Sequence, residues 1–146
     1  MEHADAAEAG DEHVDWADFS SVWQGNHLPA DVHAAFERAE NTVGVALIAL
    51  ALCHPDPQDV LPLVAKALES PSPQVREQGT VALAHTARLH RIVDQRCLVL
   101  LHEYPRGNVA DDDLWSFVPH RELPLWLWRH QAKERMIWWL HDRWQR

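Results

Sequence analysis

Cysteine is scarce in this chain of 146 residues, which has only two, Cys53 and Cys97. Two isolated cysteines provide neither the disulfide framework of a small secreted domain nor the ligand set of a zinc site. Both lie in apolar stretches, ALALCH and RCLVLL, where a free thiol usually acts as a small buried hydrophobe. We therefore expect a reduced, cytoplasmic protein.

Glycine and long apolar runs are also scarce. The five glycines are scattered, so the chain has no glycine-rich loop of the kind that holds phosphates. The longest apolar run, VALIALALC, is shorter than the roughly 20 residues that a membrane-spanning helix needs. No basic stretch followed by an apolar one stands at the start. The sequence predicts a soluble protein of the size of one domain, without membrane association.

Basic residues are nearly missing from residues 1–40, which hold ten acidic residues and one arginine. Residues 41–146 hold twelve acidic and twelve basic residues, so the net charge of -9 comes from the N-terminal end. Acidic segments repel nucleic acids and anionic membranes and attract cationic proteins. We expect residues 1–13 to be an acidic arm that meets a basic partner, or else an ordinary solvated terminus. The candidate contacts are Asp11, Glu12 and Asp15.

Residues 14–146 are expected to form a single all-α domain. Apolar side chains recur there with the period of an α-helix, and prolines separate the helical runs. TVGVALIAL aligns with TVALAHTAR 38 residues later, and VLPLVAKAL aligns with VDQRCLVLL 33 residues later. A helical pair that repeats in this way predicts a short α-solenoid of antiparallel helix pairs, with a repeat core over residues 42–104.

The stretch LPLVAKALESPSPQVREQGTVALAH, residues 61–85, predicts one helical hairpin. Asp59 can cap its first helix, which puts Pro62 in the first turn, where the missing N–H would have no intrahelical partner anyway. A turn at PSP follows. Glycine inside the second helix costs about 1 kcal/mol unless a neighbouring backbone approaches closely. We therefore expect Gly79 to lie at a tight contact between helices.

This hairpin resembles a HEAT repeat. In that family, a first helix with a proline and a tight turn precede a Val-Arg pair and small residues in the second helix. The residues at those positions here are Pro62, Val75, Arg76 and Gly79. The resemblance implies a HEAT-like solenoid over about residues 42–104 but no particular chemistry. Ser70 replaces the aspartate that commonly pairs with the arginine of a neighbouring repeat, so the resemblance does not extend to the family's ladder of ion pairs.

Residues suited to catalysis or metal binding form no recognised motif. The chain has eleven histidines but neither an H-E-x-x-H sequence nor paired cysteines. His102 and Glu103 resemble one His-Glu pair of the HEAT-type iron hydroxylases, which need several such pairs around one site. Cys53 precedes His54, but its apolar surroundings disfavour a reactive thiolate. We expect no enzyme activity, no metal and no cofactor.

Residues 105–124 are expected to form a long loop between helices. Long loops inside compact domains are often functional. Its three consecutive aspartates can bind a cation or stabilise the start of a helical turn, and the helix dipole favours the second role. The candidate partner-binding residues of this segment are Asp111, Asp112, Asp113, Trp115 and Phe117.

Tryptophan is concentrated at the C-terminal end, where six of the eight fall in the last 32 residues. Residues 125–144 are expected to form a helix that caps the solenoid with one broad side. Leu127 and Trp138 would point the other way, either covered by the 105–124 loop or available to a partner. A homodimer through this helix is a further option. The side expected to pack consists of Leu125, Trp126, Trp128, Ala132, Met136, Trp139 and Leu140.

Together these features favour a protein-binding helical-repeat module. VREQGTVALAHTARLHRIVD is similar to small bacterial HEAT-type proteins, some of which give immunity to secreted toxins. The most concrete expectation is therefore an immunity protein that occludes a cationic toxin of the nuclease type, because acidic inhibitors imitate a phosphate-bearing ligand. The alternatives are an adaptor or assembly factor with the same fold and, from another class, a metal-dependent hydroxylase built on HEAT repeats.

Overall fold

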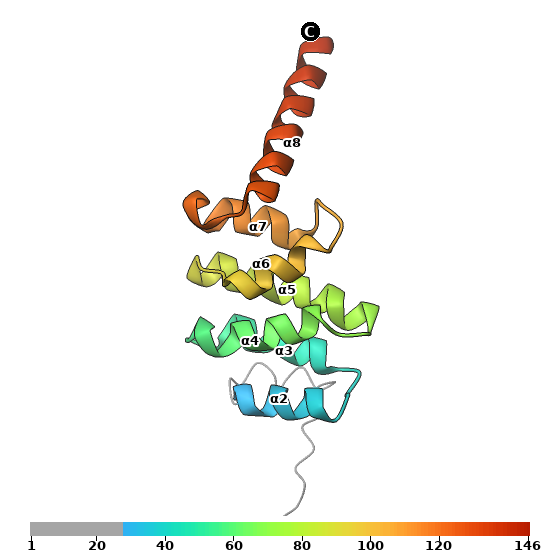
Figure 1. Ribbon diagram of the computed structural model, residues 1–146, viewed down its shortest axis with the longest axis vertical. Coiled ribbons are helices and arrows are strands. Elements are labelled where there is room, and N and C mark those ends of the chain that lie inside the picture. The colour runs from blue at the N-terminus through green and yellow to red at the C-terminus, as the bar shows by residue number, and fades with distance from the viewer. Residues whose placement is uncertain (1–27) are drawn as a thin grey trace, which may run out of the picture.

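The computed structural model describes residues 28–146, which form seven α-helices, one short 3-10 helix and no strand (Figure 1). The prediction of an all-α chain is confirmed for this part of the sequence. The arm residues Asp11, Glu12 and Asp15 lie outside the described residues. The elements are α2 (Pro29–Glu37), α3 (Val43–Cys53), α4 (Pro57–Leu68), α5 (Pro73–His90), α6 (Gln95–His102), α7 (Val109–Phe117), η1 (His120–Glu122) and α8 (Leu125–Trp144).

The helices α2 to α7 alternate between two rows. The helix α4 packs against α2 and α6 in one row, while α5 packs against α3 and α7 in the other and also against α4. In Figure 1 the helices follow one another upward, from α2 at the bottom through α3 and α4, then α5 and α6, to α7. The helix α5 is therefore the central element, with neighbours on three sides. None of the helices described is long and apolar enough to cross a membrane.

The apolar pattern of each helix matches the number of neighbours it has. The sequence of α3, VGVALIALALC, is apolar nearly all round, and this helix packs against α2, α4 and α5. The helix α4 has an apolar and a polar side and buries only the first. Burial of these side chains supplies the main driving force for folding. The largest fully buried side chains are Leu47, Leu50, Leu61, Leu83, Leu101, Leu114, Leu127, Val32, Val60, Val64 and Thr86.

The expected position of Pro62 is wrong. The helix α4 begins at Pro57, because the side chain of Asp56 accepts the N–H of Gln58 (2.9 Å) and so forms the N-cap three residues before the expected one, Asp59. Pro62 is consequently inside the helix rather than in its first turn. At that position proline removes an intrahelical hydrogen bond to the carbonyl of Gln58.

The expected tight contact at Gly79 is confirmed. A Cβ atom on this residue would lie 3.0 Å from the Cβ of Ala67 and 3.3 Å from the backbone nitrogen of Leu68, both in α4. The contact joins α5 to α4, the two helices on either side of the PSP turn. Arg76 acts within the same hairpin, where its Nη1 donates to the carbonyl of Ser70 (2.8 Å). Arg76 therefore donates a hydrogen bond to the backbone of the turn that follows α4, in place of the pairing with an aspartate that is common in HEAT repeats.

The prediction of one long loop over residues 105–124 is wrong, because this segment contains α7 and η1. Asn108 is the N-cap of α7, and its side-chain oxygen accepts the N–H of Asp111 (2.9 Å). The helix then buries Ala110, Asp111 and Leu114 against the rest of the body. This cap makes the connection between α6 and α7 short.

The C-terminal helix has the expected bounds but not the expected packing. In Figure 1, α8 leaves the stacked helices and extends away from them, and only Leu127 is buried along its length. The prediction that one broad side caps the solenoid is therefore wrong. The helices α2 to α7 already cover one another, and only the first turns of α8 lie against α7. Most members of the expected packing side are exposed, namely Leu125, Trp128, Ala132, Met136, Trp139 and Leu140.

The two cysteines differ in burial. Cys97 is fully buried in α6, as expected, and its thiol donates to the carbonyl of Leu61 (Sγ to O 3.6 Å). Burial raises the pKa of this thiol far above its usual range. Cys53 is exposed at the end of α3, contrary to expectation. The last turn of α3 therefore extends past the helices that cover its middle.

Candidate functional site

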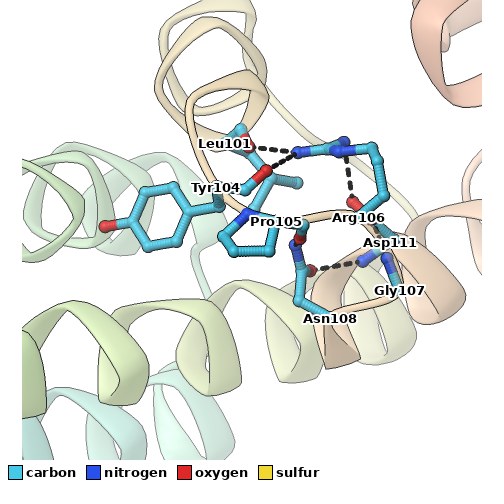
Figure 2. A network of polar contacts seen from close by, with 7 residues as sticks. All are labelled: Leu101, Tyr104, Pro105, Arg106, Gly107, Asn108 and Asp111. Carbon is cyan, nitrogen blue, oxygen red and sulfur yellow. Dashed lines mark hydrogen bonds and ion pairs between the residues drawn. The ribbon is translucent and has the colours of Figure 1, made fainter.

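A buried ion pair between Arg106 and Asp111 holds the connection between α6 and α7 (Figure 2). The Nη1 of Arg106 donates to Oδ1 of Asp111 (3.1 Å), and the N–H of Gly107 donates to Oδ2 (2.9 Å). The Nη2 of Arg106 donates to the carbonyls of Leu101 (2.5 Å) and Tyr104 (2.8 Å), at the end of α6. One guanidinium thus joins the end of one helix to the start of the next.

The three consecutive aspartates differ in their access to a partner. Asp111 is fully buried, so its carboxylate is not part of the surface. Burial raises the pKa of Asp111, while Arg106 and the N–H of Gly107 act against that shift. Asp112 is exposed and Asp113 is partly exposed. Within residues 28–146, no group of three or more His, Cys, Asp or Glu side chains could hold a metal ion.

The first turn of α8 is attached to the same network through Trp126. The guanidinium of Arg106 lies over the Trp126 ring, 4.1 Å from its centroid. The ring of His102, at the end of α6, is stacked on Trp126 with a centroid distance of 4.9 Å. Cation–π and stacking contacts of this kind each contribute about 0.5–1.5 kcal/mol. Trp126 is therefore an anchor of α8 on the body.

A second aromatic cluster fixes the turn between α7 and α8. His120 is stacked on Trp115 (centroids 3.8 Å apart), and Trp128 meets Trp115 edge-on at 5.0 Å. The indole N–H of Trp128 donates to the carbonyl of His120 (3.1 Å). Trp115 is thus half-buried by its own neighbours, and Phe117 is also partly covered. Leu127, which the sequence left either covered or available, is fully covered.

Beyond this base, α8 exposes large apolar side chains on several sides. Trp138 is 72% exposed and Trp144 is 87% exposed. The structure therefore places Trp138 at the surface, in the outer half of α8. Trp115 and Asp112 belong to α7, at the attached end of this helix. Residues 125–146 contain five basic and two acidic residues, so α8 is basic although the chain is acidic. The other exposed apolar residues of this part are Met136, Ile137, Trp139 and Leu140.

Sequence reasoning missed part of this surface because it assigned Met136, Trp139 and Leu140 to the core. A signal was present, since Arg129 and Lys133 interrupt the apolar side of α8. Charged side chains are almost never fully buried without a partner. A helix side that carries two unpaired bases is therefore a poor candidate for complete burial in the core of its own chain, although it can border an interface whose edge leaves the charged ends in water.

No protein-family model, curated protein or solved structure matches this chain. What it does must be inferred from its own surface. The exposed apolar side chains of α8 are the strongest feature of the described surface, because contiguous exposed apolar area marks interaction sites in soluble proteins.

Proposed function

We propose that this chain is a protein-binding helical-repeat module, and that α8 carries its main binding surface. The observation that carries this proposal is the exposure of large apolar side chains along a helix that leaves the body. Tryptophan is the residue most enriched at binding hot spots. Trp138 is the best candidate anchor for another protein, because it is 72% exposed on a rigid helix.

We infer that the body is a HEAT-like α-solenoid of antiparallel helix pairs. The alternation of helices between two rows supports this inference, since stacked pairs bury a continuous core. The buried Val75 and the close contact of Gly79 with α4 are consistent with it. The helix α8 stands in place of a capping helix, but it leaves most of its own apolar surface uncovered.

The most concrete version of the function is an immunity protein that occludes a cationic toxin of the nuclease type. Its support is the net charge of -9, most of it in the N-terminal segment. Because α8 itself is basic, attraction of a cationic partner has to come from residues outside this helix. We assign that steering to Asp11, Glu12 and Asp15, with Asp112 and Asp113 on α7, and the anchoring to Trp138.

The test is coexpression with the product of the neighbouring gene, followed by kinetics of the purified pair. We expect the wild-type chain to neutralise a toxic basic protein. Trp138→Ala should mainly speed dissociation, because the lost contact is desolvated in the complex. The combined variant Asp11→Asn, Glu12→Gln and Asp15→Asn should mainly slow association, with a weaker dependence on salt.

Three results would change the proposal. Stable binding to a protein that is not toxic would favour the adaptor or assembly factor. Stoichiometric iron in the purified chain would instead favour the hydroxylase. Equal salt dependence for the wild type and the neutralised variant would remove the arm from the mechanism, because steering by its charges would then contribute nothing.

A further inference from the structure

One side of α8 carries a row of exposed apolar residues, here called the α8 stripe, which Arg129 and Lys133 interrupt. Its members lie on one side of the helix, because each follows another at a spacing of three or four positions, except for the adjacent pair Trp139 and Leu140. Met136 is 57% exposed and Trp139 is 54% exposed, with the guanidinium of Arg143 5.2 Å from the centroid of the Trp139 ring. Trp138 lies on a different side, two positions from Met136. The α8 stripe consists of Leu125, Trp128, Ala132, Met136, Trp139 and Leu140.

We propose that the α8 stripe pairs antiparallel with the same stripe of a second copy of this chain. The pair is a symmetric dimer in which each helix covers the other. It goes beyond the function proposed above, because it uses a different side of α8 from Trp138. It also requires no toxin, so the two proposals can fail separately.

The size of the stripe fits a dimer. Its five large side chains each present on the order of 100 Å² of apolar surface, which gives about 500 Å² for each chain. A stable interface buries about 800 Å² for each partner, including its polar rim. The neighbouring Trp144 and the aliphatic stems of Arg129 and Lys133 can supply the remainder.

The basic residues within and beside the stripe decide the direction of pairing. In a parallel pair, Arg129, Lys133 and Arg143 would each lie beside their own copy, and like charges that face each other are destabilising. In an antiparallel pair with full overlap, the first residue of the helix faces the last. Arg129 then faces Leu140, and Lys133 faces Met136. No base of the stripe meets another base in that register.

Charge at the two ends of α8 also favours the antiparallel arrangement. The free end carries Arg143 and Arg146 against one acid, Asp142, which pairs with Arg146 (2.9 Å), so it keeps one positive charge. The attached end is bordered by η1, where Arg121 offsets Glu122, and by α7, where Asp112 and Asp113 make the border acidic on balance. A helix of 20 residues is about 30 Å long, so in an antiparallel pair the basic end of each helix reaches the acidic border of the second copy.

A membrane surface fits this helix less well than a second copy does. A helix that lies on a bilayer carries its basic residues on the side opposite its apolar one. Here Arg129 and Lys133 lie next to the stripe, while Trp138 lies among the polar residues. The apolar surface is therefore divided between two sides, and a bilayer could cover only one of them.

Sedimentation equilibrium of the full chain at micromolar concentration tests the dimer. We expect a dimer for the wild type and a dissociation constant at least about thirtyfold higher for Met136→Glu combined with Trp139→Glu. Trp138→Glu is the control, since it adds a charge at a tryptophan outside the stripe that is even more exposed than Trp139 (72% against 54%). A monomeric wild type would overturn the proposal. An equal effect of the control would also overturn it, as would binding of the monomer to anionic vesicles.

Disulfide trapping tests the direction of the pair. In a Cys53→Ser background, chains with Arg129→Cys are mixed with chains that carry Leu140→Cys, and the mixture is oxidised. We expect crosslinks between unlike chains, because only those Cα atoms come within disulfide range in the antiparallel register. Crosslinks between like chains only, or none, would overturn the antiparallel pair. Circular dichroism of the variants confirms that α8 remains helical.

Discussion

The helices α5 and α8 are similar in length, with 18 and 20 residues, but they differ in what surrounds them. The helix α5 buries mainly small side chains, including Gly79, Ala82 and Thr86, and has neighbours on three sides. The helix α8 carries tryptophans around its circumference and buries only Leu127. The small residues of α5 allow neighbouring helices to approach it closely. The large side chains of α8 can be buried only against a surface of complementary shape. The first helix is a core element, and the second is the element to which we assign binding in the proposed function.

Replacement of one leucine by alanine in each helix should give the largest difference in stability between α5 and α8. Leu83→Ala in α5 should lower the free energy of unfolding by about 2–5 kcal/mol, because the side chain is fully buried and leaves a cavity. Leu140→Ala in α8 should change it by less than about 0.5 kcal/mol for the monomer, because this leucine is exposed. Urea denaturation at low protein concentration measures both. Similar losses would mean that α8 packs on the body in solution.

A larger side chain where α5 closely approaches α4 should lower the stability almost as much. Gly79→Leu should destabilise the fold by about 1–3 kcal/mol, because a side chain there would meet Ala67 and the backbone of Leu68. Gly79→Ala should cost less, since its single methyl needs only a small shift of α4. Thermal denaturation of the two variants shows which of them is destabilised more. A neutral Gly79→Leu would show that the two helices separate at little cost.

The buried carboxylate at the base of α8 should have an effect of similar size or smaller. Asp111→Asn should lower the free energy of unfolding by about 1–3 kcal/mol, because the amide keeps only one of the two oxygens that accept from Arg106 and from the N–H of Gly107. Asp112→Asn is the control, since that side chain is exposed and should be nearly neutral.

The pH dependence follows from the raised pKa of Asp111, which burial causes. A carboxyl with a raised pKa in the folded state contributes stability that is fully present below its ordinary pKa. That contribution is lost as the pH rises through the raised value. The advantage of the wild type over Asp111→Asn should therefore shrink as the pH rises from the ordinary pKa of aspartate. Denaturation at several pH values measures this difference, and an advantage that grows over the same range would show that the pairing with Arg106 outweighs burial.

The helical content could be predicted from the sequence because the 3.6-residue period depends only on local order along the chain. Helix starts were harder, since several capping residues compete, and Asp56 rather than Asp59 caps α4. The helix α7 was missed although Asn108 precedes it as a cap, because three adjacent aspartates look like a loop in isolation. The cap of α4 lies three residues earlier than expected, and this shift moves Pro62 from the first turn to the interior of the helix.

The candidate site was harder to predict than the fold. The sequence identified the tryptophan-rich helix, because composition alone reveals it. It could not decide which apolar side is covered, since that depends on whether another helix stands opposite. Leu127 proved to be covered and Trp138 exposed, although both had been assigned to one side of α8. The first turns of α8 pack against the body, and the later turns do not. Whether a side chain of α8 is buried therefore depends more on its position along the helix than on the side of the helix on which it lies.

The smallest expected effect on stability distinguishes the attached end of α8 from its free end. Trp138→Ala should leave the free energy of unfolding within about 0.5 kcal/mol of the wild type, because the side chain is 72% exposed. Trp126→Ala, the matched tryptophan at the base, should cost about 1 kcal/mol or more, because it loses contacts with Arg106 and His102. Calorimetry at low protein concentration compares the two. If Trp138→Ala also destabilised the monomer, the free end of α8 would have to pack on its own chain, and the surface offered to other proteins would be smaller than the structure indicates.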